Sequence, residues 1–363
     1  MSRVYNFAPG PAALPLPALE RAAKELVEFG GAGMSVMEMS HRSKMYLEIF
    51  DRVKSRFNQL MGVPDGYTTL LLQGGATQQF AAVPLNLLGE GDSAAYVDSG
   101  NFAHGAISEA KKYGAVVIAG DGSADKYTYI PNVDASGLAG CKYLHITTNN
   151  TVYGTRWPAL PSKESVPESI PLVADMSSNI LSETYDVSQF GVIYAGAQKN
   201  IGPAGLTVVI VRNDLLGSAR KSCPKVMNWK LQADNDSMLN TPPCYAIYMA
   251  GLCLDWLDEQ GGVKGIESVN VEKARLLYEA IDESRLFGNP VKPVDRSRMN
   301  VVFTTGSADK DDAFCKSAAK AGLVNLKGHR VVGGMRASIY NAMPIEGVKS
   351  LIEFMRRFEK DNP

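Results

Sequence analysis

The stretch Gly191-Val192-Ile193-Tyr194-Ala195-Gly196-Ala197-Gln198-Lys199-Asn200 decides the fold and the chemistry that this chain is expected to have. Residues 192–195 form a short, wholly apolar run, which is typical of a buried strand. Lys199 follows this run and precedes a turn rich in glycine, so a primary amine stands at the end of a buried element. A lone lysine in such a place is more often a structural residue with its charged group in water. Other parts of the chain decide against that interpretation.

A second apolar run, at residues 171–174, ends in Asp175. A lysine and an aspartate that are each placed by a strand are the two groups that pyridoxal phosphate requires. The amine reacts with the aldehyde of the cofactor, and the carboxylate keeps the ring nitrogen protonated so that the ring can withdraw electrons. We therefore predict that the chain binds pyridoxal phosphate, with Lys199 and Asp175 as its catalytic residues.

Length and composition limit the possible classes of protein. The chain has 363 residues, of which 45% are hydrophobic and 21% charged, values that are ordinary for a globular protein of two domains. The net charge of −1 gives no electrostatic reason to expect nucleic acid or a membrane surface as a partner. No apolar run has the length of a signal peptide or a membrane span, and the five cysteines are scattered. These features predict a soluble, cytoplasmic protein with free thiols.

Strand-like and helix-like segments alternate through most of the sequence. Several of the strand-like runs are apolar throughout, which is typical of a mostly parallel sheet with helices on both faces. We therefore predict an α/β fold with a sheet of about seven strands. The predicted strands are residues 68–72, 94–97, 115–118, 143–146, 172–174, 192–195 and 206–211.

The helical pattern predicts how the chain is divided. Helices are expected from residue 15 to residue 29, and at residues 43–61, 244–259 and 267–283. Towards the C-terminus, strands at 299–303 and 335–339 alternate with helices at 313–321 and 346–358. We expect a large cofactor-binding domain at residues 16–262 and a smaller α/β domain at 263–363, joined by the N-terminal segment 1–15.

The turn that follows the first predicted strand is a candidate anion site. Gly74 and Gly75 allow backbone N–H groups to converge there at the start of a helix, where the helix dipole favours negative charge, and Thr77 adds a hydroxyl donor. An ordinary tight turn would have the same sequence. The chain contains neither a P-loop nor a GxGxxG turn after a strand, which argues against a nicotinamide or flavin cofactor.

Two further residues are candidates for contact with a flat cofactor ring. Phe102 follows the strand at residues 94–97 and can stack on such a ring, although a lone phenylalanine is more often part of the core. Thr151 lies in a polar loop after the strand that ends at residue 146, where its hydroxyl can reach a ring substituent. A plain turn residue would fit that position almost as well.

A set of cations matches no requirement of the scaffold. The pairs His41-Arg42 and His329-Arg330, together with Arg336, can hold a substrate that has both a carboxylate and a phosphate. Each of them alone would usually be a solvated surface cation. The histidines lack the spacing of metal ligands, so we expect no metal site.

Longer motifs give the chain a family resemblance that covers essentially its whole length. The motifs are Asn6-Phe7 with Gly10-Pro11, Ser35-Val36-Met37-Glu38 with Ser40-His41-Arg42, Gln79-Phe80-Ala81-Ala82-Val83-Pro84, the stretch at residues 191–200, Asn240-Thr241-Pro242-Pro243, Gly328-His329-Arg330 and Gly333-Gly334-Met335-Arg336-Ala337-Ser338. In these motifs the chain resembles the phosphoserine aminotransferase family. This family is a branch of the class-V aminotransferases, which depend on pyridoxal phosphate and have fold type I, the aspartate-aminotransferase-like fold.

The resemblance implies a role for each candidate residue around the cofactor. Lys199 would form the covalent bond to the cofactor and move the proton during transamination. Asp175 would pair with the ring nitrogen, Phe102 would stack on the ring, and Thr151 would lie beside it. The cofactor phosphate would be held by Ala76, Thr77 and Gln198, and from a second subunit by Asn240 and Thr241.

The resemblance also implies how substrates bind at the interface of a homodimer. Arg336 would hold the α-carboxylate of the substrate. The phosphate of the substrate, or the distal carboxylate of glutamate, would be surrounded by residues of both subunits, namely His41, Arg42, His329 and Arg330. The sequence does not divide these four between the two anions.

Three positions depart from the family pattern. Phe102 stands where tryptophan is common, which leaves a smaller ring face for stacking. Ala76-Thr77 stands where Gly-Arg is frequent, so the grip on the cofactor phosphate would depend more on backbone donors. Pro9 stands where serine is common, and proline has no N–H to offer a ligand, which puts residue 9 in doubt as a ligand.

The expected reaction transfers an amino group from L-glutamate to 3-phosphohydroxypyruvate, giving O-phospho-L-serine and 2-oxoglutarate in serine biosynthesis. The sequence leaves open whether phosphohydroxythreonine, in pyridoxine biosynthesis, is a second substrate. One alternative is a desulfurase or a small-amino-acid transaminase on the same scaffold. A desulfurase needs a reactive cysteine on a mobile loop, whereas Cys244 and Cys315 stand in helix-like contexts. Another alternative is a non-catalytic protein that binds a phosphorylated metabolite and has no coloured cofactor.

Overall fold

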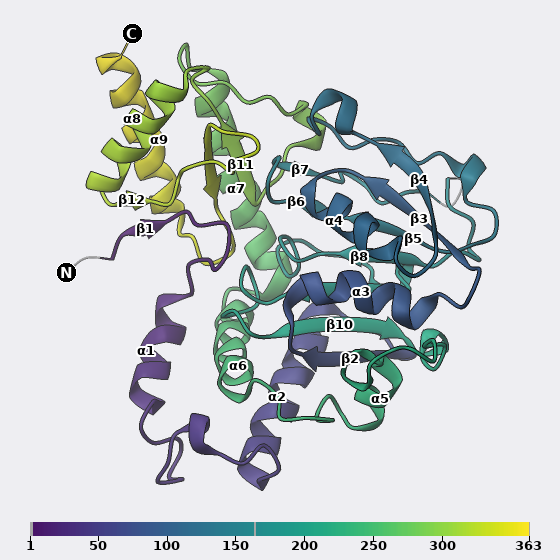
Figure 1. Cartoon of the computed structure of the whole chain (residues 1–363). Coiled ribbons are helices and arrows are strands. Elements are labelled where there is room, and N and C mark those ends of the chain that lie inside the picture. Colours follow the sequence, from purple (N-terminus) through teal and green to yellow (C-terminus); the bar gives the residue numbers. More distant parts are fainter. Residues whose placement is uncertain (1–2, 163–164, 363) are drawn as a thin grey trace.

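The computed structural model describes residues 3–162 and 165–362. Within these residues the chain alternates strands and helices around one large sheet (Figure 1). The helices are α1 (Leu16–Glu25), α2 (Lys44–Met61), α3 (Gly75–Leu87), α4 (Asn101–Ala110), α5 (Trp229–Asp234), α6 (Cys244–Glu259), α7 (Gly262–Asp282), α8 (Ala308–Lys320) and α9 (Ile345–Asp361). The strands of the large sheet are β2 (Tyr67–Leu72), β3 (Ser93–Asp98), β4 (Ala115–Asp121), β5 (Cys141–Thr147), β8 (Leu172–Asp175), β9 (Val192–Gly196) and β10 (Thr207–Arg212).

The large sheet has the order β2-β10-β9-β8-β5-β3-β4. The pairs β3–β4, β3–β5, β5–β8 and β8–β9 are parallel, whereas β10 is antiparallel to both of its neighbours. Each of the seven runs that the sequence analysis identified forms one of these strands. The prediction of a mostly parallel, seven-stranded sheet is confirmed.

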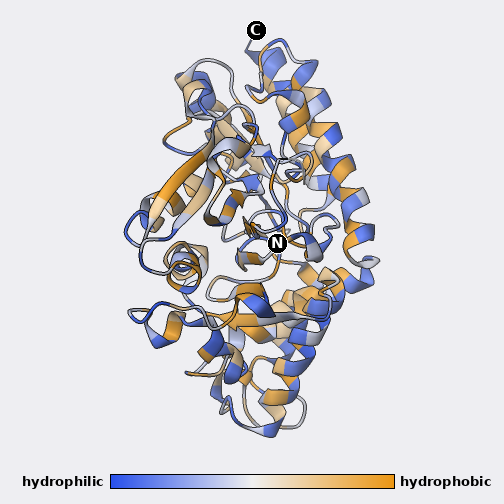
Figure 2. Cartoon of the chain, turned by 90° about the vertical axis from the view of Figure 1, so that its right-hand side faces the viewer, coloured by the Kyte–Doolittle hydropathy of each residue, from blue (hydrophilic) through white to orange (hydrophobic). Residues whose placement is uncertain are grey.

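Alternate residues of the strands point to opposite faces of this sheet, and helices cover both faces. On one face, Leu70, Tyr96 and Val209 pack in one apolar cluster with residues of α3 and α4. On the other face, Leu71, Val97 and Val208 pack in a second cluster with residues of α2 and α6. Figure 2 shows the strands largely in hydrophobic colours and the outer helices banded with both colours, as expected of helices that bury one side.

Three element boundaries differ from the sequence-based expectation by four or five residues. Helix α1 ends at Glu25 instead of residue 29, because the chain turns there and Phe29 exchanges backbone hydrogen bonds with Ala32 and Met34. Helix α7 begins at Gly262, five positions before residue 267, because Gly261 reverses the chain with a left-handed φ of 85°. Helix α8 begins at Ala308 and not at 313, since the Ser307 side chain accepts a hydrogen bond from the N–H of Lys310.

Smaller strands and the last helices form a separate apolar cluster. Strand β11 (Asn300–Phe303) pairs with β13 (Met335–Ser338), and β1 (Tyr5–Asn6) pairs with β12 (Leu323–Val324). Phe7 packs in this cluster with residues of α7, α8 and α9, so the N-terminal segment lies against the C-terminal elements (Figure 1). The division into domains at residues 262 and 263 stays a prediction.

Candidate active site

A cavity of about 240 Å³ lies where β5, β8 and β9 end and helices α3 and α4 begin. Ligand sites of α/β proteins commonly lie at this edge of the sheet, because loops and helix N-termini converge there. The residues that line it include most of the site residues expected from the sequence, namely Ala76, Thr77, Phe102, Thr151, Asp175, Gln198, Lys199, His329 and Arg336.

Lys199 is buried in this cavity, three residues after the end of β9. Its Nζ atom donates a hydrogen bond to Oγ1 of Thr151 at 2.7 Å and lies 5.3 Å from the centroid of the Phe102 ring. Burial lowers the pKa of Lys199 to about 8, a shift that the Asp175 carboxylate opposes and the Arg336 guanidinium favours. The amine is therefore far closer to neutrality at physiological pH than an exposed lysine.

Asp175 is the last residue of β8, where it pairs with Thr147 of β5 and Tyr194 of β9. Its side chain is buried and accepts a hydrogen bond from the N–H of Ser177 at 2.9 Å. Burial raises the pKa of Asp175, while Ser177 and the charge of Lys199 act in the opposite direction. A carboxylate in this place is suited to bind a cationic ring N–H.

The turn from β2 to α3 has the geometry of an anion site. Gly74 and Gly75 have left-handed φ values of 93° and 71°, and Gly75, Ala76 and Thr77 in the first turn of α3 line the cavity. A Cβ atom at residue 74 would lie only 1.3 Å from Oε1 of Gln78, so this turn requires glycine there. This arrangement fits the expectation that backbone N–H groups contribute to binding of the cofactor phosphate.

Arg336 brings a cation into the cavity from β13. Its Nη1 atom donates to the carbonyl oxygen of Thr151 at 3.0 Å, and its buried Nε atom has no partner within the described part of the chain. The hydroxyl oxygen of Thr147, which also lines the cavity, is likewise buried and unpaired there. Unpaired donors in a buried site are costly unless a ligand satisfies them. Together with the Phe102 ring, they fit a flat cofactor with a carboxylate-bearing substrate.

The N-terminal segment contributes Pro9 and Gly10 to the lining of the cavity. The carbonyl oxygen of Pro9 accepts a hydrogen bond from the Tyr340 hydroxyl at 2.7 Å. A Cβ atom at residue 10, where φ is 139°, would lie 3.3 Å from Cγ of Lys199. Gly10 therefore fits closely against the lysine side chain, a contact that sequence reasoning missed because it joins residues far apart in the chain.

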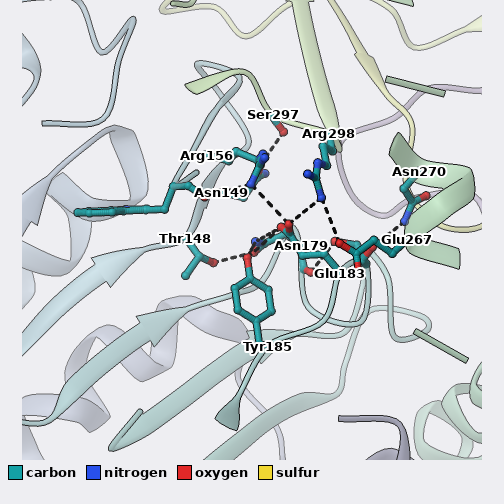
Figure 3. Close-up of polar contacts among 12 residues, drawn as sticks. Thr148, Asn149, Arg156, Asn179, Glu183, Tyr185, Glu267, Asn270, Ser297 and Arg298 are labelled. Atoms are coloured by element: carbon teal, nitrogen blue, oxygen red, sulfur yellow. Dashed lines mark hydrogen bonds and ion pairs between the residues drawn. The ribbon is translucent and has the colours of Figure 1, made fainter. Parts of the chain in front are cut away.

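A polar network lies behind the loop that contains Thr151 (Figure 3). Thr148 donates through Oγ1 to the carbonyl oxygen of Asp175 at 3.1 Å and to Oδ1 of Asn179 at 2.7 Å. Asn179 in turn donates to Glu183 and to the hydroxyl of Tyr185. The network therefore links the loop beside the cavity directly to the end of β8.

Glu183 is the centre of this network. Its carboxylate is 10% exposed and accepts from Arg156 at 3.5 Å, from Arg298 at 3.2 Å and from the Tyr185 hydroxyl at 2.9 Å. Arg298 also reaches Glu267 of α7 at 3.3 Å. No motif in the sequence indicated this network, since its members are distant in the chain and individually ordinary.

Five expected site residues do not line the cavity of this single chain. Asn240 and Thr241 are exposed, although Gln73 at the end of β2 donates to the carbonyl oxygen of Thr241. His41 and Arg42 follow the 3-10 turn Val36–Glu38, where His41 has a buried Nε2 atom without a partner among the described residues. Arg330 is exposed beside His329. Their expected roles stay predictions.

The described residues contain neither a cluster of metal ligands nor a helix that could span a membrane. No group of His, Cys, Asp and Glu residues within 3–162 and 165–362 is arranged to hold a metal ion. In the same part of the chain, no helix is long and apolar enough to cross a membrane.

The sheet, the buried lysine and aspartate and the arginine with an unpaired Nε atom together define an aminotransferase-like fold and site. The sequence model of the class-V aminotransferases matches residues 4–351, and the chain belongs to this family. Within it, the chain belongs with the phosphoserine aminotransferases. A phosphoserine aminotransferase of Bacillus cereus is 52% identical over 365 residues, which is 100% of both chains.

Solved structures agree with this placement. The phosphoserine aminotransferase of Bacillus circulans subsp. alkalophilus superposes with a TM-score of 0.96 at 44% identity and covers 99% of each chain. The phosphoserine aminotransferase of Trichomonas vaginalis, whose crystal structure contains bound PLP, has a TM-score of 0.93 at 38% identity, with 98% of this chain and 100% of that chain covered. The expectation of the aspartate-aminotransferase-like fold is confirmed.

Proposed function

We propose that this chain transfers the amino group of L-glutamate to 3-phosphohydroxypyruvate with pyridoxal phosphate as cofactor, giving O-phospho-L-serine and 2-oxoglutarate. The observation that supports this most is the placement of one buried amine. Nζ of Lys199 lies in a cavity with a carboxylate, an aromatic ring and a guanidinium whose Nε atom is unpaired, in a chain that belongs with the phosphoserine aminotransferases. The reaction is a step of serine biosynthesis.

The lining residues fit the cofactor. Pyridoxal phosphate, when bound, supplies a ring that withdraws electrons from the substrate Cα–H bond. Asp175 would hold the ring nitrogen in its protonated form, Phe102 would stack on the ring face and Thr151 would lie beside it. The backbone at the start of α3, with Ala76, Thr77 and Gln198, would hold the phosphate.

Lys199 acts as the acid and base of the reaction. Its amine would take the proton from the substrate Cα and pass it, within the same half-reaction, to the cofactor carbon that is joined to the amino nitrogen. The second half-reaction would run the same two transfers in reverse. A lysine with a pKa of about 8 is suited to this, because proton transfer is most effective when the pKa of the group lies near the working pH. The hydrogen bond to Thr151 holds the nitrogen inside the cavity.

The substrates bind through cations. Arg336 takes the α-carboxylate, since its guanidinium is buried and keeps Nε free for a bidentate pair. His329 and Arg330 approach the phosphate or the distal carboxylate from the same subunit. His41 and Arg42 reach it from the second subunit of a homodimer, and Asn240 and Thr241 of that subunit complete the cofactor phosphate site. We propose that the enzyme works in the cytoplasm.

The desulfurase alternative finds no support at the cavity. Among the described residues, no cysteine lines it. Burial raises the pKa of Cys253 to about 12, and that of Cys315 to about 11, where nearby Asp312 and Asp311 add to the effect, so neither is a ready thiolate. Thiol-blocking reagents should therefore leave turnover largely intact.

Half-reactions of the loaded enzyme test the proposal directly. O-phospho-L-serine and L-glutamate should each change the absorbance of the cofactor rapidly, and L-alanine should do so far more slowly. Borohydride reduction followed by peptide mapping should place the cofactor adduct at Lys199. Equal rates with alanine, or an adduct at another lysine, would contradict the proposed function.

Two further measurements refine the choice of substrate. Arg42→Ala and Arg330→Ala should weaken O-phospho-L-serine far more than an unphosphorylated amino acid, whereas equal losses would show that these residues do not discriminate. Phosphohydroxythreonine should be compared in the same half-reaction. A rate close to that of O-phospho-L-serine would support a second role in pyridoxine biosynthesis.

A further inference from the structure

Helix α7 places a lysine in the interior of the chain, away from any acid. Lys273 is fully buried, and its Nζ donates to three carbonyl oxygens, those of Ile339 at 3.0 Å, Tyr340 at 2.8 Å and Met343 at 3.0 Å. Within the described residues, no carboxylate lies within 4.0 Å of it. Of the two protonation states of lysine, only the ammonium form has three N–H donors for these three acceptors.

Two effects act on the charge of this group in opposite directions. Burial lowers the pKa of Lys273 to about 7, whereas the three carbonyl acceptors stabilise the ammonium form. An apolar side chain of similar volume would avoid the cost of desolvation altogether. Lys273 therefore contributes more by fixing the positions of these three carbonyl groups than by filling space in the core.

The backbone that Lys273 holds is the turn at residues 339–343, which connects β13 with α9. This turn contacts two residues that lie near Lys199, namely Asn200 and Pro9. The N–H of Asn341 donates to Oδ1 of Asn200, the residue directly after Lys199, at 3.0 Å. The Tyr340 hydroxyl donates to the carbonyl oxygen of Pro9, which precedes the glycine that fits against Cγ of Lys199.

Asn270, which lies one helical turn before Lys273 on α7, supports the same turn. Its Nδ2 atom donates to Oδ1 of Asn341 at 2.9 Å and to the carbonyl oxygen of Ser182 at 3.0 Å. Residues three apart on a helix lie on one face, so Asn270 and Lys273 both hydrogen-bond to this turn from the same side of α7. Asn270, Lys273 and residues 339–343 do not line the cavity.

We propose that Lys273 is a positioning residue for the reaction: its ammonium group fixes the turn at residues 339–343, and this turn holds Asn200 and Pro9, and through them the side chain of Lys199. Lys273 touches neither cofactor nor substrate in this arrangement. The inference rests on the proposed function only in calling Lys199 the reactive amine; the contacts themselves are independent of it.

Competitive labelling of the full-length, cofactor-free chain tests this without any turnover. Trace acetic anhydride is applied across a pH range, and the extent of modification at Lys199 is read by mass spectrometry. In Lys273→Met, the midpoint of the Lys199 profile should rise from about 8 by at least about half a pH unit, because a less constrained amine is better solvated. In the loaded enzyme, kcat should fall by about 10-fold or more, with a smaller change in KM.

Leu277→Ala is the matched control, because Leu277 is a fully buried residue of the same helix, one turn after Lys273, and packs in the apolar cluster. It should destabilise the chain without moving the Lys199 profile. Asn200→Ala removes the acceptor of the Asn341 N–H, so it should shift the Lys199 labelling midpoint as Lys273→Met does. This variant replaces Lys273→Met in the test if Lys273→Met does not fold.

The outcomes separate cleanly. An unmoved Lys199 profile in Lys273→Met or in Asn200→Ala overturns the proposal, as does an equal shift in Leu277→Ala. In the double variant Lys273→Met/Asn200→Ala, the fold-loss in kcat should be smaller than the product of the two single losses. A fully multiplicative loss would also overturn the proposal. If the wild-type enzyme fails to transaminate phosphoserine, the proposed function fails, while the labelling profiles still decide the role of Lys273.

Discussion

Nζ of Lys199 lies 2.7 Å from Oγ1 of Thr151, and the carbonyl oxygen of the same threonine accepts a hydrogen bond from Arg336. One residue of the β6–β7 loop, between β6 (Asn149–Asn150) and β7 (Thr155–Arg156), therefore contacts both the candidate reactive amine and the candidate carboxylate site. Because these contacts are made through its hydroxyl and its backbone, the position of the loop sets the geometry of both groups. The behaviour of Lys199 is then open to several direct measurements.

The first prediction concerns the protonation of Lys199. Because Asp175 stabilises the ammonium form, Asp175→Asn should move the labelling midpoint of Lys199 below about 8. Because Arg336 disfavours the ammonium form, Arg336→Met should move the midpoint above that value, and Arg336→Lys should move it less. The pH profile of acetylation at Lys199 measures all three. Shifts in the same direction for Asp175→Asn and Arg336→Met would show that charge does not control this amine.

The second prediction concerns Phe102, whose ring centroid lies 5.3 Å from Nζ of Lys199. An aromatic stacking contact contributes about 0.5–1.5 kcal/mol beyond the area that it buries. Phe102→Leu should therefore weaken cofactor binding by roughly 2- to 10-fold. Phe102→Trp should bind at least as tightly as the native chain. Spectroscopic titration of the cofactor-free protein measures both, and an unchanged affinity in Phe102→Leu would remove the stacking role.

The sequence was sufficient to predict the elements that local pattern determines. Seven apolar runs became the seven strands of the sheet, and the lysine and aspartate that follow two of them meet in one cavity. Strands β1 and β12 were not predicted, because each has two residues and is fixed only by its partner. Gly10 was noted as part of a motif, but its fit against Lys199 depends on the fold of the whole chain.

The network around Glu183 could not be predicted from the sequence for the same reason, because it depends on the fold of the whole chain. It joins Arg156 and Tyr185 with Arg298 and Glu267, across more than a hundred positions of the sequence. Each residue alone has the pattern of a solvated surface charge or a loop residue. Only the folded chain shows that the Glu183 side chain is 10% exposed and accepts hydrogen bonds from several donors, so its contribution to stability must be measured.

The third prediction is that Glu183→Gln is destabilising. It removes the carboxylate that Arg156 and Arg298 share in a partly buried network, and leaving such donors without an acceptor costs about 1–3 kcal/mol. Glu272→Gln is the control, since its ion pair with Arg275 is exposed and its loss should leave the free energy of unfolding nearly unchanged. Denaturant titration compares the two variants. Similar midpoints for both would show that the network contributes specificity and little stability.

The fourth prediction concerns His145, which lies on β5 beneath the site and is 1% exposed. Its Nε2 atom lies 2.8 Å from the Tyr194 hydroxyl, its ring stacks on Tyr96 at 4.8 Å, and its Nδ1 atom is buried without a partner in the described residues. Burial lowers the pKa of His145 from 6.5 to about 3, because the apolar surroundings disfavour the imidazolium.

The sign of the effect on stability follows from this lowered pKa. Between pH 6.5 and 3 the unfolded chain binds a proton at His145 that the folded chain excludes, so the contribution is complete above pH 6.5 and is lost on acidification. The free energy of unfolding should fall by up to about 1.4 kcal/mol per pH unit from this residue. Denaturant titrations at pH 6.5, 5.5 and 4.5 should show a shallower fall in His145→Gln than in the native chain. An identical slope in His145→Gln would mean that the acid sensitivity of the fold arises from its carboxylates alone.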